Sequence, residues 1–171
     1  MISRLSFVIV LFIFSSISCE KFSDPAPVYP KDCVFFNSFE SSSDTSGWYG
    51  ISTEAIVEDA PKVGGKYSIK ISGGCVIPHA YYWIDPLEED CSLILKCWGK
   101  NLSNGGSVSL HTDNPSSGIH VSVSELAWIS YTSEDTLHCS AGSSVRIELI
   151  SGGIISSSML IDQIEISRVD N

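Results

Sequence analysis

The feature that most constrains this chain is a series of short segments in which apolar and polar residues alternate. In segment 67–72, a tyrosine and two isoleucines would share one face, and two serines and a lysine the other. This period of two is typical of a half-buried β-strand. Turn residues separate the segments, and no stretch after residue 18 has a convincing helical period. The pattern predicts an all-β fold, an antiparallel β-sandwich (jelly roll) of about eight strands. The predicted strands are residues 33–40, 67–72, 91–100, 107–112, 119–124, 128–132, 143–150 and 159–169.

The N-terminal residues predict export. Arg4 precedes an apolar run, residues 5–14, that is typical of a signal peptide and shorter than the roughly 20 residues of a membrane span. Residues 20–31 contain three prolines and no periodicity, as in an extended linker. We therefore predict a signal peptide at 1–18, a lipidated cysteine and flexible tether at 19–31, and one β-sandwich jelly-roll domain at 32–171.

The residues before Cys19 indicate how the exported chain is held. The run 16–19, Ser-Ile-Ser-Cys, resembles the loose lipoboxes of bacterial, Bacteroidetes-type lipoproteins. Lipidation of Cys19 would anchor the chain to the membrane, at the bacterial outer membrane or cell surface. Ser16 and Ser18 also fit an ordinary cleavage site, which would release a secreted protein. We expect lipidation, with plain secretion as the alternative.

The cysteine count bears on the same choice. There are six cysteines, so lipidation of Cys19 leaves five and at least one unpaired thiol. Plain secretion would permit three bridges, and the sequence leaves their connectivity open. Cys91 and Cys97 lie on one predicted strand at a separation of about 20 Å and cannot bridge each other.

Charge and motifs exclude several classes of function. The chain has 10 basic and 20 acidic residues, which argues against binding a nucleic-acid backbone. The sequence contains no G-x-S-x-G, H-E-x-x-H, phosphate-binding loop or glycine-rich dinucleotide turn. No pair of carboxylates stands out for glycoside hydrolysis. We expect a non-catalytic protein.

The closing segment contains one misplaced charge. Simple alternation over residues 159–169 places Asp162 in the same row as Leu160, Ile164 and Ile166. A bare carboxylate in an apolar setting costs several kcal/mol or becomes protonated. Asp162 must therefore be paired, hydrogen-bonded or bound to a metal.

Several short motifs, in this order and spacing, resemble a known family. They are similar to those of the galactose-binding-like jelly rolls, a group that includes many carbohydrate-binding modules. The resemblance spans nearly all of the expected domain and implies the same β-sandwich. The matching pieces are F-E-S at 39–41, G-W at 47–48, G-K-Y-S-I-K-I-S at 65–72, L-K-C-W-G-K at 95–100, W-I-S-Y at 128–131 and M-L-I-D-Q-I-E-I at 159–166.

The resemblance also implies a structural calcium ion. Several members of the group hold calcium between their first and last strands, which carries over to Glu40, Asp162 and backbone carbonyls within 61–66. Calcium takes six to eight oxygen ligands, so two carboxylates and several carbonyls suit it. The family usually has a second aspartate where this chain has Gln163, so that ligand is lost. In the alternative, Asp162 caps a turn or accepts backbone N–H groups without a metal.

The expected ligand is a glycan. Sugars present C–H faces that stack on aromatic rings and hydroxyls that need polar partners. The residues that we expect to contact it are Tyr82, Trp83, Trp98, His111 and Arg146. We thus predict a monomeric, non-catalytic cell-envelope lipoprotein domain that binds carbohydrate. The alternative is a structural, protein-interaction or adhesion β-sandwich without a sugar ligand, whose aromatic residues are covered by loops.

Overall fold

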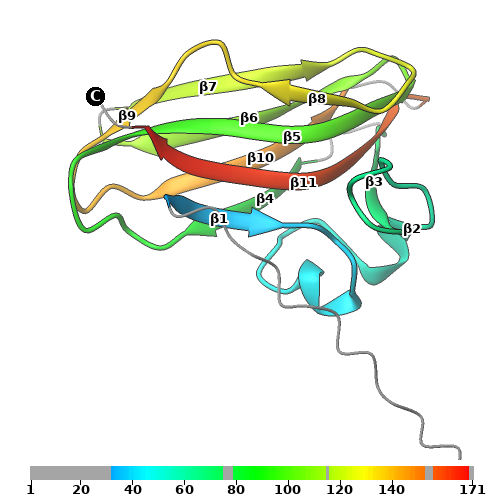
Figure 1. Ribbon diagram of the computed structural model, residues 1–171, viewed down its shortest axis with the longest axis horizontal. Coiled ribbons are helices and arrows are strands. Elements are labelled where there is room, and N and C mark those ends of the chain that lie inside the picture. The colour runs from blue at the N-terminus through cyan, green and yellow to red at the C-terminus, as the bar shows by residue number, and fades with distance from the viewer. Residues whose placement is uncertain (1–31, 75–78, 115, 153–155, 170–171) are drawn as a thin grey trace, which may run out of the picture.

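A computed structural model describes residues 32–74, 79–114, 116–152 and 156–169 (Figure 1). The described residues form two antiparallel sheets and two short 3-10 helices, Ser42–Thr45 and Thr53–Ala55. Neither of these helices is long and apolar enough to cross a membrane. The predicted signal peptide, Cys19 and the tether lie outside the described residues.

The larger sheet has the strand order β2-β3-β11-β5-β8, and β1 and β9 pair with β11 and β5 respectively. The long strands β5 and β11 run side by side through its centre (Figure 1). Its strands are β1 (Cys33–Asn37), β2 (Ile56–Val57), β3 (Ser68–Ser72), β5 (Cys91–Ser103), β8 (Ile129–Thr132), β9 (Leu137–Cys139) and β11 (Ser158–Val169).

The smaller sheet has the order β4-β10-β6-β7, and all its pairs are antiparallel. Its strands are β4 (His79–Ile84), β6 (Gly106–Asp113), β7 (Ser116–Val123) and β10 (Val145–Ser151). Alternate residues of both sheets point into one shared core, where Leu95, Leu110 and Ile147 are fully buried. Removing these side chains from water is the main force that holds the two sheets together. The predicted β-sandwich is confirmed.

Strand β4 is the main element that alternation did not reveal. Its inward residues Ala80, Tyr82 and Ile84 pack on the core, and its outward residues include Tyr81 and Trp83. Because both faces carry aromatic side chains, the run shows no contrast of apolar and polar residues. The short strands β2 and β9 escape detection for a simpler reason, since two and three residues are too few to show a period of two.

Strand β11 departs from simple alternation at one residue. Gln163 has a φ of 46°, and the register with β5 shifts between Asp162 and Glu165. Such a bulge moves the following side chains to the other face. Ile161 and Ile164 therefore both face the core, and Asp162 points to the opposite face. The prediction that Asp162 shares a row with Ile164 and Ile166 is wrong, although Asp162 is still fully buried.

Candidate functional site

The outer face of the smaller sheet carries a row of aromatic and polar residues. Strand register places Trp83 of β4, Arg146 of β10, His111 of β6 and Gly118 of β7 side by side. Beside this row is a hollow of about 280 Å³, which we call the Trp83 groove. It is lined by Trp83, His111, Thr112, Asp113, Ser116, Ser117, Ser144 and Arg146.

Glu148 contacts both Arg146 and His111 of this row. Its Oε2 lies 3.3 Å from His111 Nε2 and 3.7 Å from Arg146 Nη2. The Arg146 guanidinium lies 5.4 Å from the centre of the Trp83 ring, a cation–π distance. Glu148 is only 8% exposed, whereas Trp83 is 47% exposed. The groove therefore combines the accessible ring of Trp83 with two polar side chains, Arg146 and His111, that contact the buried Glu148.

Gly118 makes room for the histidine of the row. A Cβ atom at Gly118 would lie 2.4 Å from His111 Nδ1, far inside van der Waals contact. Glycine in this edge strand thus lets the imidazole extend over β7. Any larger residue at position 118 would push His111 out of the row.

A pair of stacked aromatic rings continues the row along β4. Tyr49 stacks on Tyr81 with 4.9 Å between ring centres and 12° between planes. Two backbone hydrogen bonds of 2.8 and 3.0 Å also join these residues. Tyr81 and Trp83 are two apart on one strand face, so their Cα atoms lie about 7 Å apart. Tyr49 was not expected from the sequence, because it lies in a loop without periodicity.

Two of the five predicted ligand residues lie elsewhere. Tyr82 points into the sandwich, where its ring centre is 4.8 Å from that of Phe35 and 5.5 Å from that of Trp48. Trp98 lies on the outer face of the larger sheet, directly opposite Asp162 in the register. The structure thus brings Trp83, His111 and Arg146 together and separates Tyr82 and Trp98 from them.

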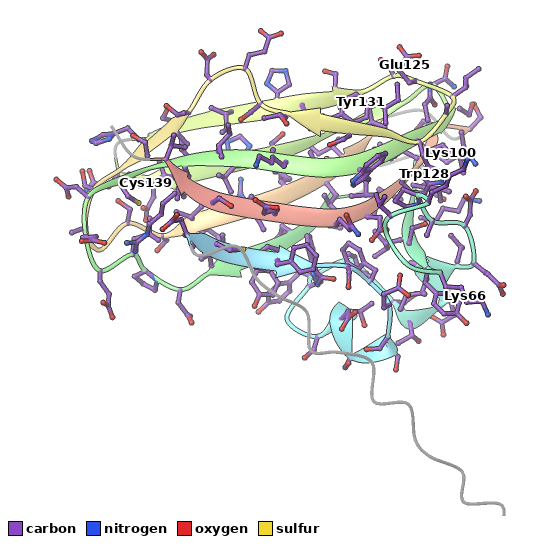
Figure 2. The ribbon with its side chains drawn as sticks, in the orientation of Figure 1. Lys66, Lys100, Glu125, Trp128, Tyr131 and Cys139 are labelled. Atoms are coloured by element: carbon purple, nitrogen blue, oxygen red, sulfur yellow. The ribbon has the colours of Figure 1, made fainter. Side chains whose placement is uncertain are left out.

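Trp98 lines a different hollow, of about 420 Å³, together with Trp128 and residues 60, 62 and 63. Trp128 Nε1 and Lys100 Nζ each donate a hydrogen bond of 2.8 Å to Asp59. Figure 2 labels the two donor residues. Burial acts to raise the pKa of Asp59, but these two donors lower it overall. This cluster fixes segment 59–63 over the larger sheet.

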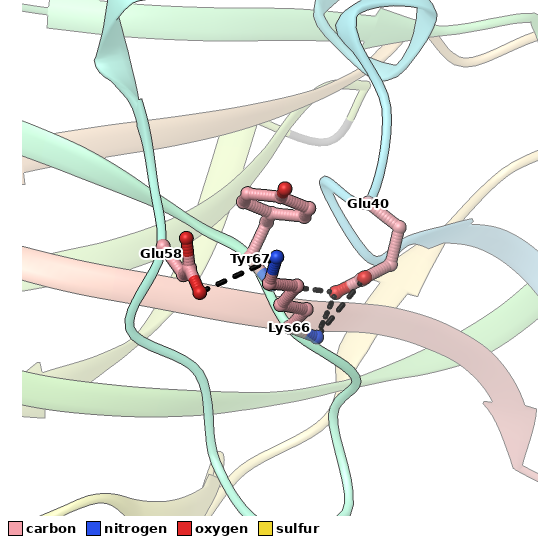
Figure 3. Close-up of polar contacts among 4 residues, drawn as sticks. All are labelled: Glu40, Glu58, Lys66 and Tyr67. Carbon is pink, nitrogen blue, oxygen red and sulfur yellow. Dashed lines mark hydrogen bonds and ion pairs between the residues drawn. The ribbon is translucent and has the colours of Figure 1, made fainter.

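The predicted metal ligands also lie near this segment. Asp162 Oδ1 accepts a hydrogen bond of 2.7 Å from the Gln163 amide, and Oδ2 is buried without a partner among the described residues. Burial raises the pKa of Asp162 to about 8, and the carboxylate of Glu40 adds to the rise. Glu40 itself accepts the backbone N–H groups of Lys66 and Tyr67 at 3.0–3.1 Å (Figure 3).

Two glycines bring the backbone against both carboxylates. A Cβ atom at Gly64 would lie 2.2 Å from Asp162 Oδ2, and one at Gly65 would lie 2.4 Å from Glu40 Oε1. Gly65 has a φ of 103°, which side chains rarely tolerate. The described residues contain no group of three or more His, Cys, Asp or Glu that would hold a metal. The two carboxylates, one of which has an unsatisfied buried oxygen, still fit a hard cation completed by carbonyls or water.

Comparisons with known proteins show the fold. No family model and no curated protein matches the sequence. A xylan-binding domain, CBM22-1 of Paenibacillus barcinonensis Xyn10C, superimposes with a TM-score of 0.57 at 16% identity, over 82% of this chain and 96% of that one. The TmCBM61 module, solved with β-1,4-galactotriose, gives 0.50 at 14% identity, over 77% and 94%. The Cry4Aa toxin from Bacillus thuringiensis gives 0.52 at 9% identity, over 71% and 22%.

The chain thus has a β-sandwich jelly-roll fold like those of these two carbohydrate-binding modules. The fold expected from the resemblance is confirmed. At these identities the likeness concerns the fold alone, because one scaffold carries sites for many different functions.

Proposed function

We propose that this protein is a non-catalytic carbohydrate-binding domain that holds a glycan in the Trp83 groove. The observation that carries the proposal is the row of Trp83, Arg146 and His111 beside a hollow on one sheet face. The domains with similar folds that bind xylan or β-1,4-galactotriose support the same class of ligand.

The groove offers the two kinds of contact that a sugar needs. The exposed face of Trp83 would stack against the C–H groups of a pyranose ring, a large apolar contact with one defined orientation. Arg146 would donate to ring hydroxyls, and His111 and the serines of the groove would exchange hydrogen bonds with them. Arg146 Nε is buried without a partner among the described residues, so a ligand or bridging-water oxygen that reached it would relieve an unsatisfied donor.

The same groups give no reason to propose catalysis. Glu148 is held between Arg146 and His111, so its charge is already matched by donors. Asp113 is at the rim and accepts the Ser144 N–H at 3.0 Å. We therefore infer that both carboxylates position neighbouring groups. We expect the bound glycan to be released unchanged.

The test is a titration of xylohexaose, β-1,4-galactotriose and a wider glycan array against wild-type protein and two variants. Trp83→Ala should weaken binding at least tenfold, which corresponds to about 1.4 kcal/mol. Trp98→Ala, a matched loss of a tryptophan from the other sheet, should leave affinity unchanged. A blank array, or equal loss in both variants, would favour the alternative of a structural or protein-interaction domain.

We also propose that the domain is displayed from a cell envelope through lipid on Cys19. The proposal rests on the sequence at 1–19 and on the proline-containing tether. Mass spectrometry of the mature N-terminus separates the two possibilities. Acylated Cys19 supports the anchor, and an unmodified N-terminus generated by cleavage after the signal peptide supports secretion.

Calcium is the proposed structural ion of the fold. Asp162 and Glu40 would hold it, together with oxygen atoms of segment 61–66. The ion would be the positively charged partner of the buried Asp162 Oδ2, which has no hydrogen-bond partner among the described residues. The ion would fix this segment to β11 and would take no part in glycan contact. Its removal is tested below by stability, independently of binding.

A further inference from the structure

Two cysteines of the larger sheet face each other across a strand pair. In the antiparallel register of β5 and β9, Cys91 is directly opposite Cys139. Cys139 is fully buried, and Cys91 is half-buried and packs against the same core. Figure 2 shows Cys139 at the end of the sandwich remote from Trp128.

This placement meets the geometric requirement for a disulfide. Directly opposite residues of an antiparallel pair have Cα atoms about 4.5–5.5 Å apart and side chains on the same face. A disulfide needs a Cα separation of about 4.4–6.8 Å. The other described cysteines face no cysteine, because Cys33 is opposite Ser167 and Cys97 is opposite Tyr131.

We propose that Cys91 and Cys139 form a disulfide that joins β5 to β9 when the protein is in an oxidising compartment. Both are free thiols in this structure. The bridge would close the chain between residues 91 and 139, a segment that contains β5, β6, β7, β8 and β9. It would hold the three-residue strand β9 against the sheet.

The chemistry requires a disulfide oxidant, such as oxidised glutathione or an envelope thiol oxidoreductase. The more accessible Cys91 thiolate attacks the oxidant, forms a mixed disulfide and releases one thiolate. The Cys139 thiolate then attacks Cys91 Sγ and displaces the second thiolate. The two protons lost by the cysteines go to the two leaving thiolates, and the oxidant gains two electrons.

Burial of the two thiols predicts the stage of folding at which the disulfide forms. It raises the pKa of both thiols, and the neighbouring Cys91 thiolate further raises that of Cys139. Since the thiolate is the reactive species, oxidation of the folded, reduced protein should be slow. Oxidation should be faster while β9 is still open, during folding.

The experiment is a disulfide map of the chain exported to a bacterial periplasm and trapped with N-ethylmaleimide. Cleavage after lysine, arginine and glutamate separates Cys75 from Cys91, because Glu88 and Glu89 lie between them. We expect a linked pair of peptides containing Cys91 and Cys139, two hydrogens lighter than the reduced pair, that reduction separates. Alkylated thiols at both positions, or a link from either to another cysteine, would overturn the proposal.

Stability gives a second readout that uses matched variants. Closing a loop of this length should raise Tm on the order of 10 °C over the reduced protein. Cys91→Ser and Cys139→Ser should each abolish the reduction-dependent change, while Cys33→Ser should retain it. If Cys139→Ser fails to fold, Cys91→Ser and the wild-type peptide map still decide the question. A reduction-dependent change that persists in Cys91→Ser would contradict the bridge.

Discussion

The replacement Asp162→Asn tests the most unusual group in the domain. In the metal-free protein the pKa of Asp162 rises from its ordinary 3.8 to about 8, mainly because it is buried. Between these values the folded protein holds a proton that the unfolded chain releases. The free energy of unfolding should therefore fall as pH rises from about 4 to about 8. The stability that the protonated Asp162 contributes should be fully present only below about pH 4.

The magnitude follows from proton linkage. One proton held only by the folded state changes stability by about 1.4 kcal/mol per pH unit. The full window gives a ceiling of roughly 6 kcal/mol, and water entering beside the exposed Glu40–Lys66 contact should reduce it to about 2–4 kcal/mol. Asparagine cannot ionise, so in EDTA at pH 8 the variant should be the more stable protein.

Calcium should reverse this order. It binds the ionised Asp162 and would stabilise the wild type by about 2.7 kcal/mol at one hundred times its dissociation constant. Urea unfolding at pH 4, 6 and 8, in EDTA and in calcium, measures both effects. Glu58→Gln is the control, because this acid is exposed and pairs with Lys66 (Figure 3). Identical wild-type stability in EDTA and calcium would refute the metal site, and an unchanged pH slope in Asp162→Asn would refute the proton assignment.

Three further changes test the site and the core. Gly118→Ala should displace His111 and weaken glycan binding about three- to tenfold without loss of fold, as titration and circular dichroism would show; unchanged affinity would remove His111 from the site. Glu148→Gln should weaken binding by a similar factor, because Arg146 and His111 lose the charge that positions them, and a gain in affinity would contradict this role. Ile147→Ala should cost about 2–5 kcal/mol in urea unfolding, and a loss under 1 kcal/mol would mean that the two sheets are not packed around this residue.

Sequence reasoning predicted the sandwich because most strands alternate cleanly. Strands such as β3 and β7 have one apolar and one polar face, and this contrast is visible in the residues themselves. It could not reveal β4, whose two faces both carry aromatic rings. Without that strand, the sequence does not show which of Tyr82 and Trp83 points into the core. Both rings are therefore predicted as ligand contacts, although only Trp83 points outward.

The bulge at Gln163 was equally hidden, since glutamine is not a residue that usually signals a positive φ. Asp162 was nevertheless recognised as a buried carboxylate that needs a partner. The groove itself depends on which residues of β10 and β6 lie beside Trp83 in the sheet. The register between strands that are far apart in the sequence cannot be predicted from the residues of any one strand. His111 and Arg146 were predicted as ligands, but their shared contact with Glu148 required the structure.

The most direct test of the glycan-binding proposal uses the four tryptophans of the chain. Their indole N–H groups give separate signals in a ¹H–¹⁵N spectrum and report from different places: Trp83 in the groove, Trp98 and Trp128 on the other sheet, and Trp48 in the core. During titration with a glycan that binds, the Trp83 signal should move and the other three should stay in place. Movement of Trp98 or Trp128 with a stationary Trp83 would contradict the proposed site.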